Sequence, residues 1–105
     1  MKIYKISQKE TDYYDTYDSA IVVANNEEEA KRIHPGSEDY EFEIYYNEEK
    51  KEFWNRVGNG NTYKFEDDSF GTWVNNLAYI NVEYIGEADK KYKKPQVIVA
   101  SFNAG

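Results

Sequence analysis

The chain has 105 residues, and its formal net charge of −7 comes from 20 acidic and 13 basic side chains. This length is typical of a single domain with one core, residues 1–105. With 40% hydrophobic and 17% aromatic residues, the composition excludes a disordered chain, although eleven tyrosines supply much of the apolar surface. The sequence contains no cysteine, which excludes a disulfide framework and a thiolate metal site.

The same features predict a protein of the cytoplasm. A small secreted domain commonly needs disulfides, and no apolar h-region follows Met1-Lys2. No apolar run approaches the ~18 residues of a membrane span, so we expect no membrane partner. Residues 10–50 hold 13 of the acids and only three of the bases. This acidic field repels phosphate backbones, so we expect no direct nucleic-acid binding.

The first third of the chain predicts two strands followed by a helix. Residues 1–7 alternate and predict a strand, whereas the polar residues 9–18 predict a loop. Residues 19–24 form a continuous β-branched run, typical of a strand in the centre of a sheet. Residues 25–35 predict a helix, because an asparagine can cap its start, three glutamates favour the positive end of its dipole and Pro35-Gly36 ends it.

A half-exposed strand and a hairpin are predicted next. Tyr40, Phe42, Ile44 and Tyr46 alternate with glutamates, so residues 40–46 predict a strand with one apolar face. Two further strands, over residues 52–57 and 62–66, flank the sequence Gly-Asn-Gly-Asn, which tolerates the positive φ of a tight turn.

The last third predicts two more strands. Residues 73–79 fit either a short helical turn or the entry to a strand, and residues 80–85 predict a strand that Gly86 ends. Residues 89–94 predict a charged loop, and the β-branched residues 96–102 predict a central strand. The order β-β-α-β-β-β-β-β predicts an α+β fold, a mostly antiparallel sheet of about five to seven strands with one short helix packed on a face.

Two separated segments are distinctive: YDTYDSAIVVANNEEEAKRIHPG, and TWV followed by NVEYIGEADKKYKKPQVIVASFNAG. Together they resemble a group of short proteins encoded by bacteriophages and prophages. The resemblance covers residues 1–36 and about 72–105, and residues 37–71 depart from it as an inserted strand plus hairpin. It implies a phage accessory protein that acts in the host cytoplasm, and it carries over no residue roles.

Side chains suited to catalysis or metal binding are few. His34 is the single histidine, and its place at the end of the predicted helix favours a structural role near the last carbonyls. Asp12, Asp15 and Asp18 lack the spacing of a calcium loop, and no serine lies in a Gly-x-Ser-x-Gly context. We therefore expect no enzyme activity, no metal and no cofactor; a small hydrolase that depends on His34 is the catalytic alternative.

The excess of aromatic residues is the strongest functional signal. Three tyrosines fall in the polar stretch 9–18, where they either cover the sheet or remain open to a ligand. Open rings stack on bases, and a few cations can hold phosphates. The basic residues 90–94 fit a phosphate site or a solvated turn. The candidate ligand-binding residues are Tyr13, Tyr14, Tyr17, Arg32, His34, Trp54, Arg56 and Trp73.

Two functions fit these observations. The first is a non-enzymatic phage accessory protein that counters host defence by binding and sequestering a small nucleotide-type signal. The alternative is an acidic protein–protein inhibitor, in which residues 10–50 block a basic nucleic-acid-binding groove of a host protein. An unpaired sheet edge would in addition template a homo-oligomer.

Overall fold

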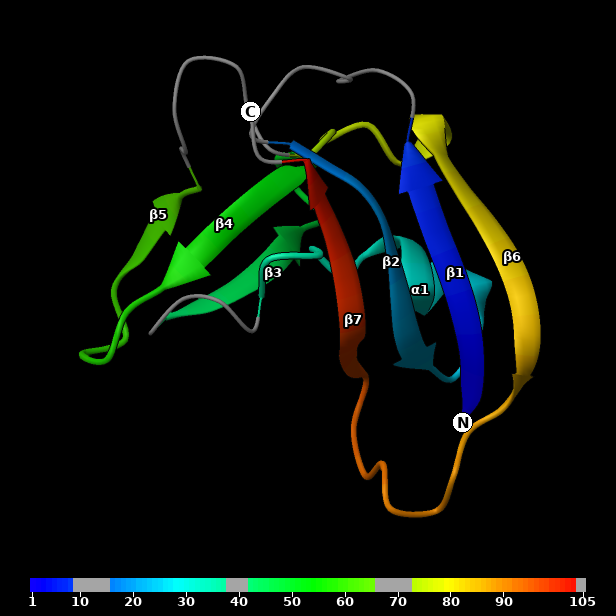
Figure 1. Ribbon diagram of the computed structural model, residues 1–105. Helices are drawn as coiled ribbons and strands as arrows, with labels where there is room; N and C mark the ends of the chain where they lie inside the picture. Colours follow the sequence, from blue (N-terminus) through cyan, green and yellow to red (C-terminus); the bar gives the residue numbers. More distant parts are fainter. Residues whose placement is uncertain (9–15, 38–41, 66–72, 104–105) are drawn as a thin grey trace.

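A computed structural model shows seven antiparallel strands in two sheets, one short helix and a 3-10 turn (Figure 1). It describes residues 1–8, 16–37, 42–65 and 73–103. The elements in chain order are β1 (Lys2–Gln8), β2 (Thr16–Ala24), α1 (Glu27–Lys31), β3 (Glu43–Asn47), β4 (Glu52–Arg56), β5 (Thr62–Lys64), the 3-10 helix η1 (Leu77–Tyr79), β6 (Ile80–Glu87) and β7 (Gln96–Asn103). The predicted α+β fold and its order of elements are confirmed. Within the described residues, no helix is long and apolar enough to cross a membrane.

The larger sheet has the strand order β6-β1-β2-β7. β2 carries the β-branched run of residues 19–24 and lies between two neighbours, as predicted for a central strand. The central position predicted for residues 96–102 is wrong, because among the described strands β7 pairs only with β2 and forms an edge of the sheet. Both strands are rich in β-branched residues, and composition does not record how many neighbours a strand has.

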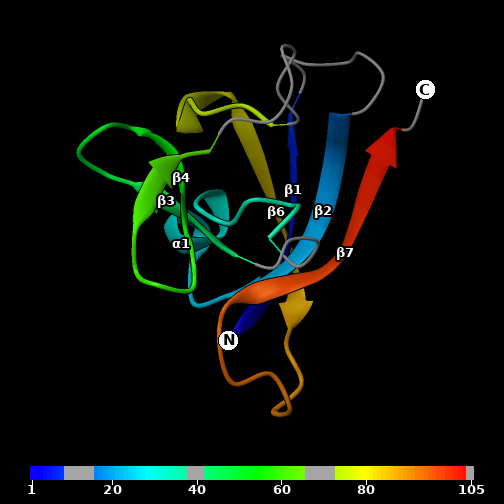
Figure 2. The same ribbon diagram turned by 90° about the vertical axis from the view of Figure 1, so that its left-hand side faces the viewer.

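The smaller sheet is a meander with the order β3-β4-β5, so the strands form two sheets instead of the single sheet predicted. The hairpin between β4 and β5 is confirmed, and Gly60 adopts the positive φ of 90° expected in its turn. Figure 2 shows the smaller sheet and α1 on the same side of the larger sheet. The fold therefore has two layers. One is the larger sheet, and the other is formed by the smaller sheet and the helix, which both pack on one face of the larger sheet.

Several predicted strand boundaries shift by a few residues, and the shifts in β2 and β6 have a structural cause. β2 begins at Thr16, so the end of the predicted loop 9–18 belongs to a strand; residues 9–15 lie outside the described part. Tyr17 packs into the core from this strand, and the apolar contacts of its ring stabilise the longer strand. β6 continues through Gly86 to Glu87, because Gly86 pairs with Ile3 of β1 and the irregularity in the register leaves out Ile85 instead of the glycine.

The helix α1 is shorter than the predicted range 25–35 but has the predicted start. The side chain of Asn26 accepts a hydrogen bond from the Glu29 amide at 2.8 Å, and the Glu29 carboxylate accepts one from the Asn25 amide at 2.7 Å. These bonds satisfy amides that a helix start leaves without partners. The helix ends at Lys31, and a turn then directs His34 into the core.

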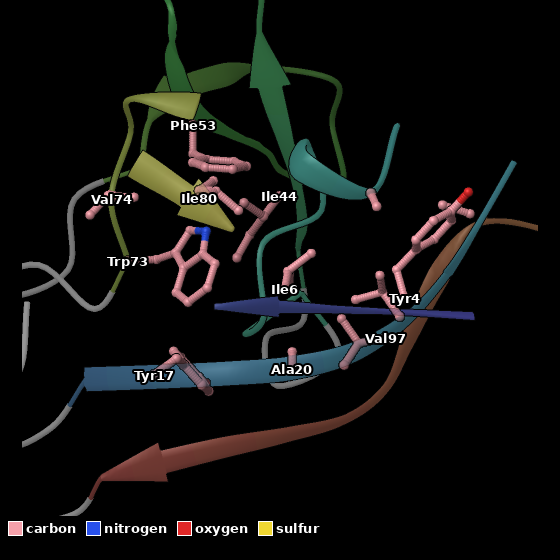
Figure 3. Packing of buried hydrophobic residues seen from close by; sticks show 13 residues of the cluster. Tyr4, Ile6, Tyr17, Ala20, Ile44, Phe53, Trp73, Val74, Ile80 and Val97 are labelled. Carbon is pink, nitrogen blue, oxygen red and sulfur yellow. The ribbon is translucent and has the colours of Figure 1, made fainter. Parts of the chain in front are cut away.

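The core lies between the larger sheet and the layer formed by α1 and the smaller sheet. Figure 3 shows Phe53 of β4 and Ile44 of β3 pointing toward Ile6 of β1. Trp73 lies beside them, and Tyr17 and Ala20 of β2 form the floor. These side chains are nearly all removed from water, so their burial is the main source of stability.

Two side-chain amides join the residues before η1 to both sheets. Gln8 is buried; its Nε2 donates to the Tyr17 carbonyl at 2.8 Å, and its Oε1 accepts from the Val74 amide at 2.9 Å. Asn75 Oδ1 accepts from the Phe53 amide at 2.9 Å. Residues 74 and 75 thus fix the smaller sheet against the larger one through buried or half-buried hydrogen bonds.

Gly36→Ala should destabilise the protein, because a methyl group at this position would lie 3.0 Å from Tyr17 Oη and 3.3 Å from His34 Nδ1. Overpacking of this kind costs about 1–3 kcal/mol of unfolding free energy, measured by urea denaturation. Gly58→Ala is the matched control, since nothing lies within 4 Å of its added methyl group. Equal stabilities of the two variants would contradict the packing described.

Candidate functional site

A hollow of about 520 Å³ lies beside the edge strand β3. We call it the β3 hollow. Its walls come from three parts of the chain: α1 and the turn after it, strand β3, and the connection from β6 into β7. The lining residues are Glu29, Arg32, Ile33, His34, Ser37, Glu43, Ile44, Tyr45, Tyr46, Lys94, Pro95 and Gln96. Its volume is in the range of small-molecule sites.

The two acids of the β3 hollow have partners outside it. The Glu29 carboxylate accepts hydrogen bonds from the backbone and side-chain nitrogens of Asn25, at 2.7 and 3.0 Å. Glu43 forms an ion pair with Arg56 at 3.1 Å. Lys94 is exposed, and within the described residues it has no ion-pair partner. Asn25 is neutral, so Glu29 keeps its negative charge, and Lys94 is the lining cation that pairs with no carboxylate of the described residues.

Arg32 is held in place by several contacts. Its Nη1 donates to the backbone and side-chain oxygens of Glu28, at 2.7 and 3.1 Å, and its Nε donates to Glu48. The Glu48 hydrogen bond raises the pKa of Arg32, which stays charged. The guanidinium also lies 5.8 Å from the centre of the Tyr46 ring, within the range of a cation–π contact.

Arg32 and Tyr46 also line a second hollow of about 560 Å³. Its other walls are Glu48 and Lys51 of the β3–β4 turn, Asn75 and Asn76 before η1, and Leu77, the first residue of η1. The two hollows thus share one cation and one ring. Burial, followed by Glu48, raises the pKa of Tyr46, so its hydroxyl stays protonated and able to donate a hydrogen bond.

His34 forms the inner wall of the β3 hollow and has a structural environment. It is 2% exposed, and its ring meets the rings of Phe53 and Phe65 edge-on at 5.1 and 5.0 Å. The Gly36 amide donates to His34 Nδ1 at 2.9 Å, which assigns the proton of the neutral imidazole to Nε2. Burial lowers the pKa of His34 to about 3, so it is neutral at physiological pH.

The structure brings two of the eight predicted ligand-binding residues together in the β3 hollow, namely Arg32 and His34. Tyr17 and Trp73 are buried in the core. The Tyr17 ring is therefore not open to a ligand, which was one of the two alternatives that the sequence offered. Tyr13 and Tyr14 lie outside the described residues.

The remaining two, Trp54 and Arg56, lie on the other face of the smaller sheet. Trp54 is opposite Tyr45 in the strand register, and the Arg56 guanidinium lies 4.7 Å from the centre of the Tyr45 ring. Glu43 and Tyr45 connect this face to the β3 hollow, because both line the hollow and both contact Arg56.

Sequence reasoning missed Tyr45 and Tyr46, which line the β3 hollow. A signal for Tyr45 exists: it takes the same phase of the strand as the charged Glu43, where an aromatic ring is unexpected. The sequence shows Lys94 as part of a basic cluster, but nothing in the sequence places it next to β3. That proximity arises from the chain crossing from β6 to the opposite edge of the larger sheet (Figure 1).

Comparisons with protein-family models, with curated proteins and with solved structures found no match. The resemblance to phage-encoded proteins therefore stays an expectation from the sequence. Within the described part of the chain, no three side chains of histidine, aspartate or glutamate gather as a metal-ligand set; Asp12 and Asp15 lie outside that part.

The stability of the fold should depend on pH through His34. Its pKa near 3 in the folded protein lies below the ~6.5 of an unfolded chain, so the unfolded state binds more protons between these values. The free energy of unfolding therefore falls as the pH is lowered from 6.5 toward 3, by about 2 kcal/mol at pH 5 relative to pH 7.

The measurement is urea denaturation of the wild type and of His34→Gln, which has no titrating ring. The glutamine variant should lose about 2 kcal/mol less than the wild type between pH 7 and pH 5. Identical pH profiles for the two proteins would contradict a buried neutral imidazole, whatever their absolute stabilities.

Proposed function

We propose that this protein binds and sequesters a small anionic ligand with an aromatic ring, of the nucleotide type, in the β3 hollow. In the setting implied by the sequence resemblance, such a ligand is a host defence signal and the protein is a phage accessory factor without enzymatic activity. The observation that carries the proposal is the combination of two tyrosines with a lysine that has no ion-pair partner among the described residues, on a wall where Glu43 pairs with Arg56 and Glu29 is hydrogen-bonded to Asn25.

The rings supply the means to hold a base. Tyr45 and Tyr46 are both half-buried, so each is fixed by its neighbours and still presents surface to the hollow. Tyr46 packs edge-on against Phe53 at 5.2 Å, and Tyr45 carries Arg56 on its face. Rings held in this way lose little conformational entropy on binding, which favours stacking with a planar ligand.

The cations supply the means to hold a phosphate. Lys94 is a point charge that forms no ion pair with any described carboxylate, and it can turn toward a phosphate oxygen at little cost. Arg32 presents a guanidinium that Glu28 and Glu48 already orient, so it acts as a fixed donor at the boundary of the two hollows. The hollow thus favours a ligand with few charges, because the overall charge of −7 opposes a highly charged one.

The first test is thermal unfolding in the presence of mono-, di- and cyclic nucleotides of adenine and guanine. A ligand at 100 times its dissociation constant stabilises the fold by about 2.7 kcal/mol, which raises the melting temperature of a domain of this size by about 10–20 °C. A panel in which no nucleotide shifts the melting temperature would overturn the proposal.

Two pairs of variants then locate the site with the nucleotide that binds. Tyr45→Ala should weaken binding by about 5- to 100-fold, the usual effect of removing a stacking ring, whereas Tyr63→Ala, an exposed ring on β5, should not. Lys94→Glu should weaken binding strongly, whereas Lys90→Glu makes the same change in net charge outside the hollow and should have little effect. Equal losses within either pair would place the site elsewhere.

One observation favours the second candidate function, an acidic inhibitor of a basic host protein. Glu27 and Glu28 at the start of α1 and Glu48 and Glu49 after β3 are all exposed. Arg32 contacts both Glu28 and Glu48, so the two acidic segments are neighbours and form one negative surface. A basic groove that normally holds phosphates complements such a surface.

This candidate predicts capture of basic nucleic-acid-binding proteins from host extract at low salt and their release as salt increases. Replacement of Glu27 and Glu49 by lysine should abolish the capture without loss of fold, because the described residues include no ion-pair partner for either one. Lys90→Glu serves as a control, since it leaves this surface unchanged. Capture that survives the two replacements would exclude the acidic surface as the contact.

A further inference from the structure

Edge strands carry unpaired backbone groups, and charged side chains commonly protect them from pairing with another chain. The described sheets have four edge strands: β6 and β7 in the larger sheet, and β3 and β5 in the smaller one. Three of them carry charge: Glu83 and Glu87 in β6, Glu43 in β3 and Lys64 in β5. β7 has the sequence QVIVASFN and carries none, although the chain as a whole is strongly charged.

The middle of β7 also exposes apolar side chains. Val99 is 57% exposed and Ile98 is 39% exposed. Ile98 lies at an irregularity in the register, since Val97 and Val99 pair with Val22 and Ile21 and Ile98 has no partner on β2. From Val99 onward β7 has no extra residue of its own, because the second irregularity in this pairing leaves out Asp18 of β2; its side away from β2 carries none of the lysines, prolines and charges that protect such edges.

We propose that β7 pairs antiparallel with β7 of a second copy of this chain, which joins the two larger sheets into one. The contact is isologous: a strand related to its copy by a two-fold axis is antiparallel to it, and each copy presents the same surface. Two-fold pairing also closes the assembly, because it uses up the edge of both copies.

Charge selects a second copy as the occupant. Each copy carries a net charge of −7, so most of its surface repels another copy. β7 has no charged side chain, so two copies that pair along it bring no like charges of this strand together. An uncharged strand also needs no oppositely charged partner. Association should therefore strengthen as salt screens the repulsion between the two copies, which is the opposite of the salt response expected for binding to a basic protein.

Two other arrangements compete with this one. In the first, the exposed face of the larger sheet packs on that of a second copy, and Ile85 of β6 then takes part as well as Val99. In the second, β7 of one copy pairs with β6 of the next, which does not close and produces filaments. Ile85 is 51% exposed and lies on the opposite edge strand, so it distinguishes these arrangements from the proposed one.

The first experiment compares Val99→Lys with Ile85→Lys by sedimentation over a wide range of protein concentrations. Both variants place the same charge on an exposed β-branched position of an edge strand. The wild type should show a reversible monomer–dimer equilibrium, Val99→Lys should be shifted toward the monomer by at least 10-fold in dissociation constant, and Ile85→Lys should match the wild type. A wild type that stays monomeric, open-ended growth, or equal effects of both substitutions would overturn the proposal.

The second experiment does not depend on the effect of a substitution on stability. Because the chain contains no cysteine, single cysteines at positions 97–101 are the only thiols present. Residues that face their own copy across an antiparallel two-fold lie within disulfide range, whereas those several positions away do not. Oxidation should cross-link one or two adjacent positions and spare the rest. Cross-linking at every position, as in parallel pairing, or at none would overturn the proposal.

Discussion

The junction of the two sheets depends on a buried, neutral imidazole. His34 follows the helix that packs on the larger sheet, and its ring contacts Tyr17 of that sheet and Phe53 of the smaller one. The Gly36 amide satisfies its Nδ1, so burial leaves that ring nitrogen with a partner. Because the turn that holds His34 is fixed in this way, Arg32 and Ser37 on either side of it form a defined wall of the β3 hollow.

The elements that could be predicted are those with local signals. The cap at Asn26, the glycine at position 60 and the alternation in β1 and β3 each depend on neighbours in the chain, and each appears in the structure. The division into two sheets and the edge position of β7 could not be predicted, because both depend on pairing between residues far apart in the sequence. The apolar runs of β2 and β7 indicate that these residues favour a buried, extended strand. They do not indicate how many strands pair with each, because that depends on the whole fold.

The candidate site shows the same limit. The polar residues around Tyr17 predict a loop, in which its ring either covers the sheet or stays open to a ligand; the strand starts one residue before it and turns the ring into the core. Tyr45 faces outward by strand periodicity, which the sequence contains, yet its position next to Lys94 requires the fold. Cation and ring are 49 positions apart in the sequence and come together across the two sheets.

The uneven charge of the sequence becomes a spatial boundary in the fold. The acidic residues 10–50 include α1 and β3, and the cluster of lysines at 90–94 lies in the β6–β7 connection. The β3 hollow is lined by both, so it is the place where the negative and positive parts of the chain meet. At such a boundary the opposing fields largely cancel, and local pairing decides the sign. Glu43 pairs with Arg56 and Glu29 is hydrogen-bonded to Asn25, whereas Lys94 has no ion-pair partner in the described part of the chain, so the proposed anion would meet the hollow at Lys94 although the molecule as a whole repels it.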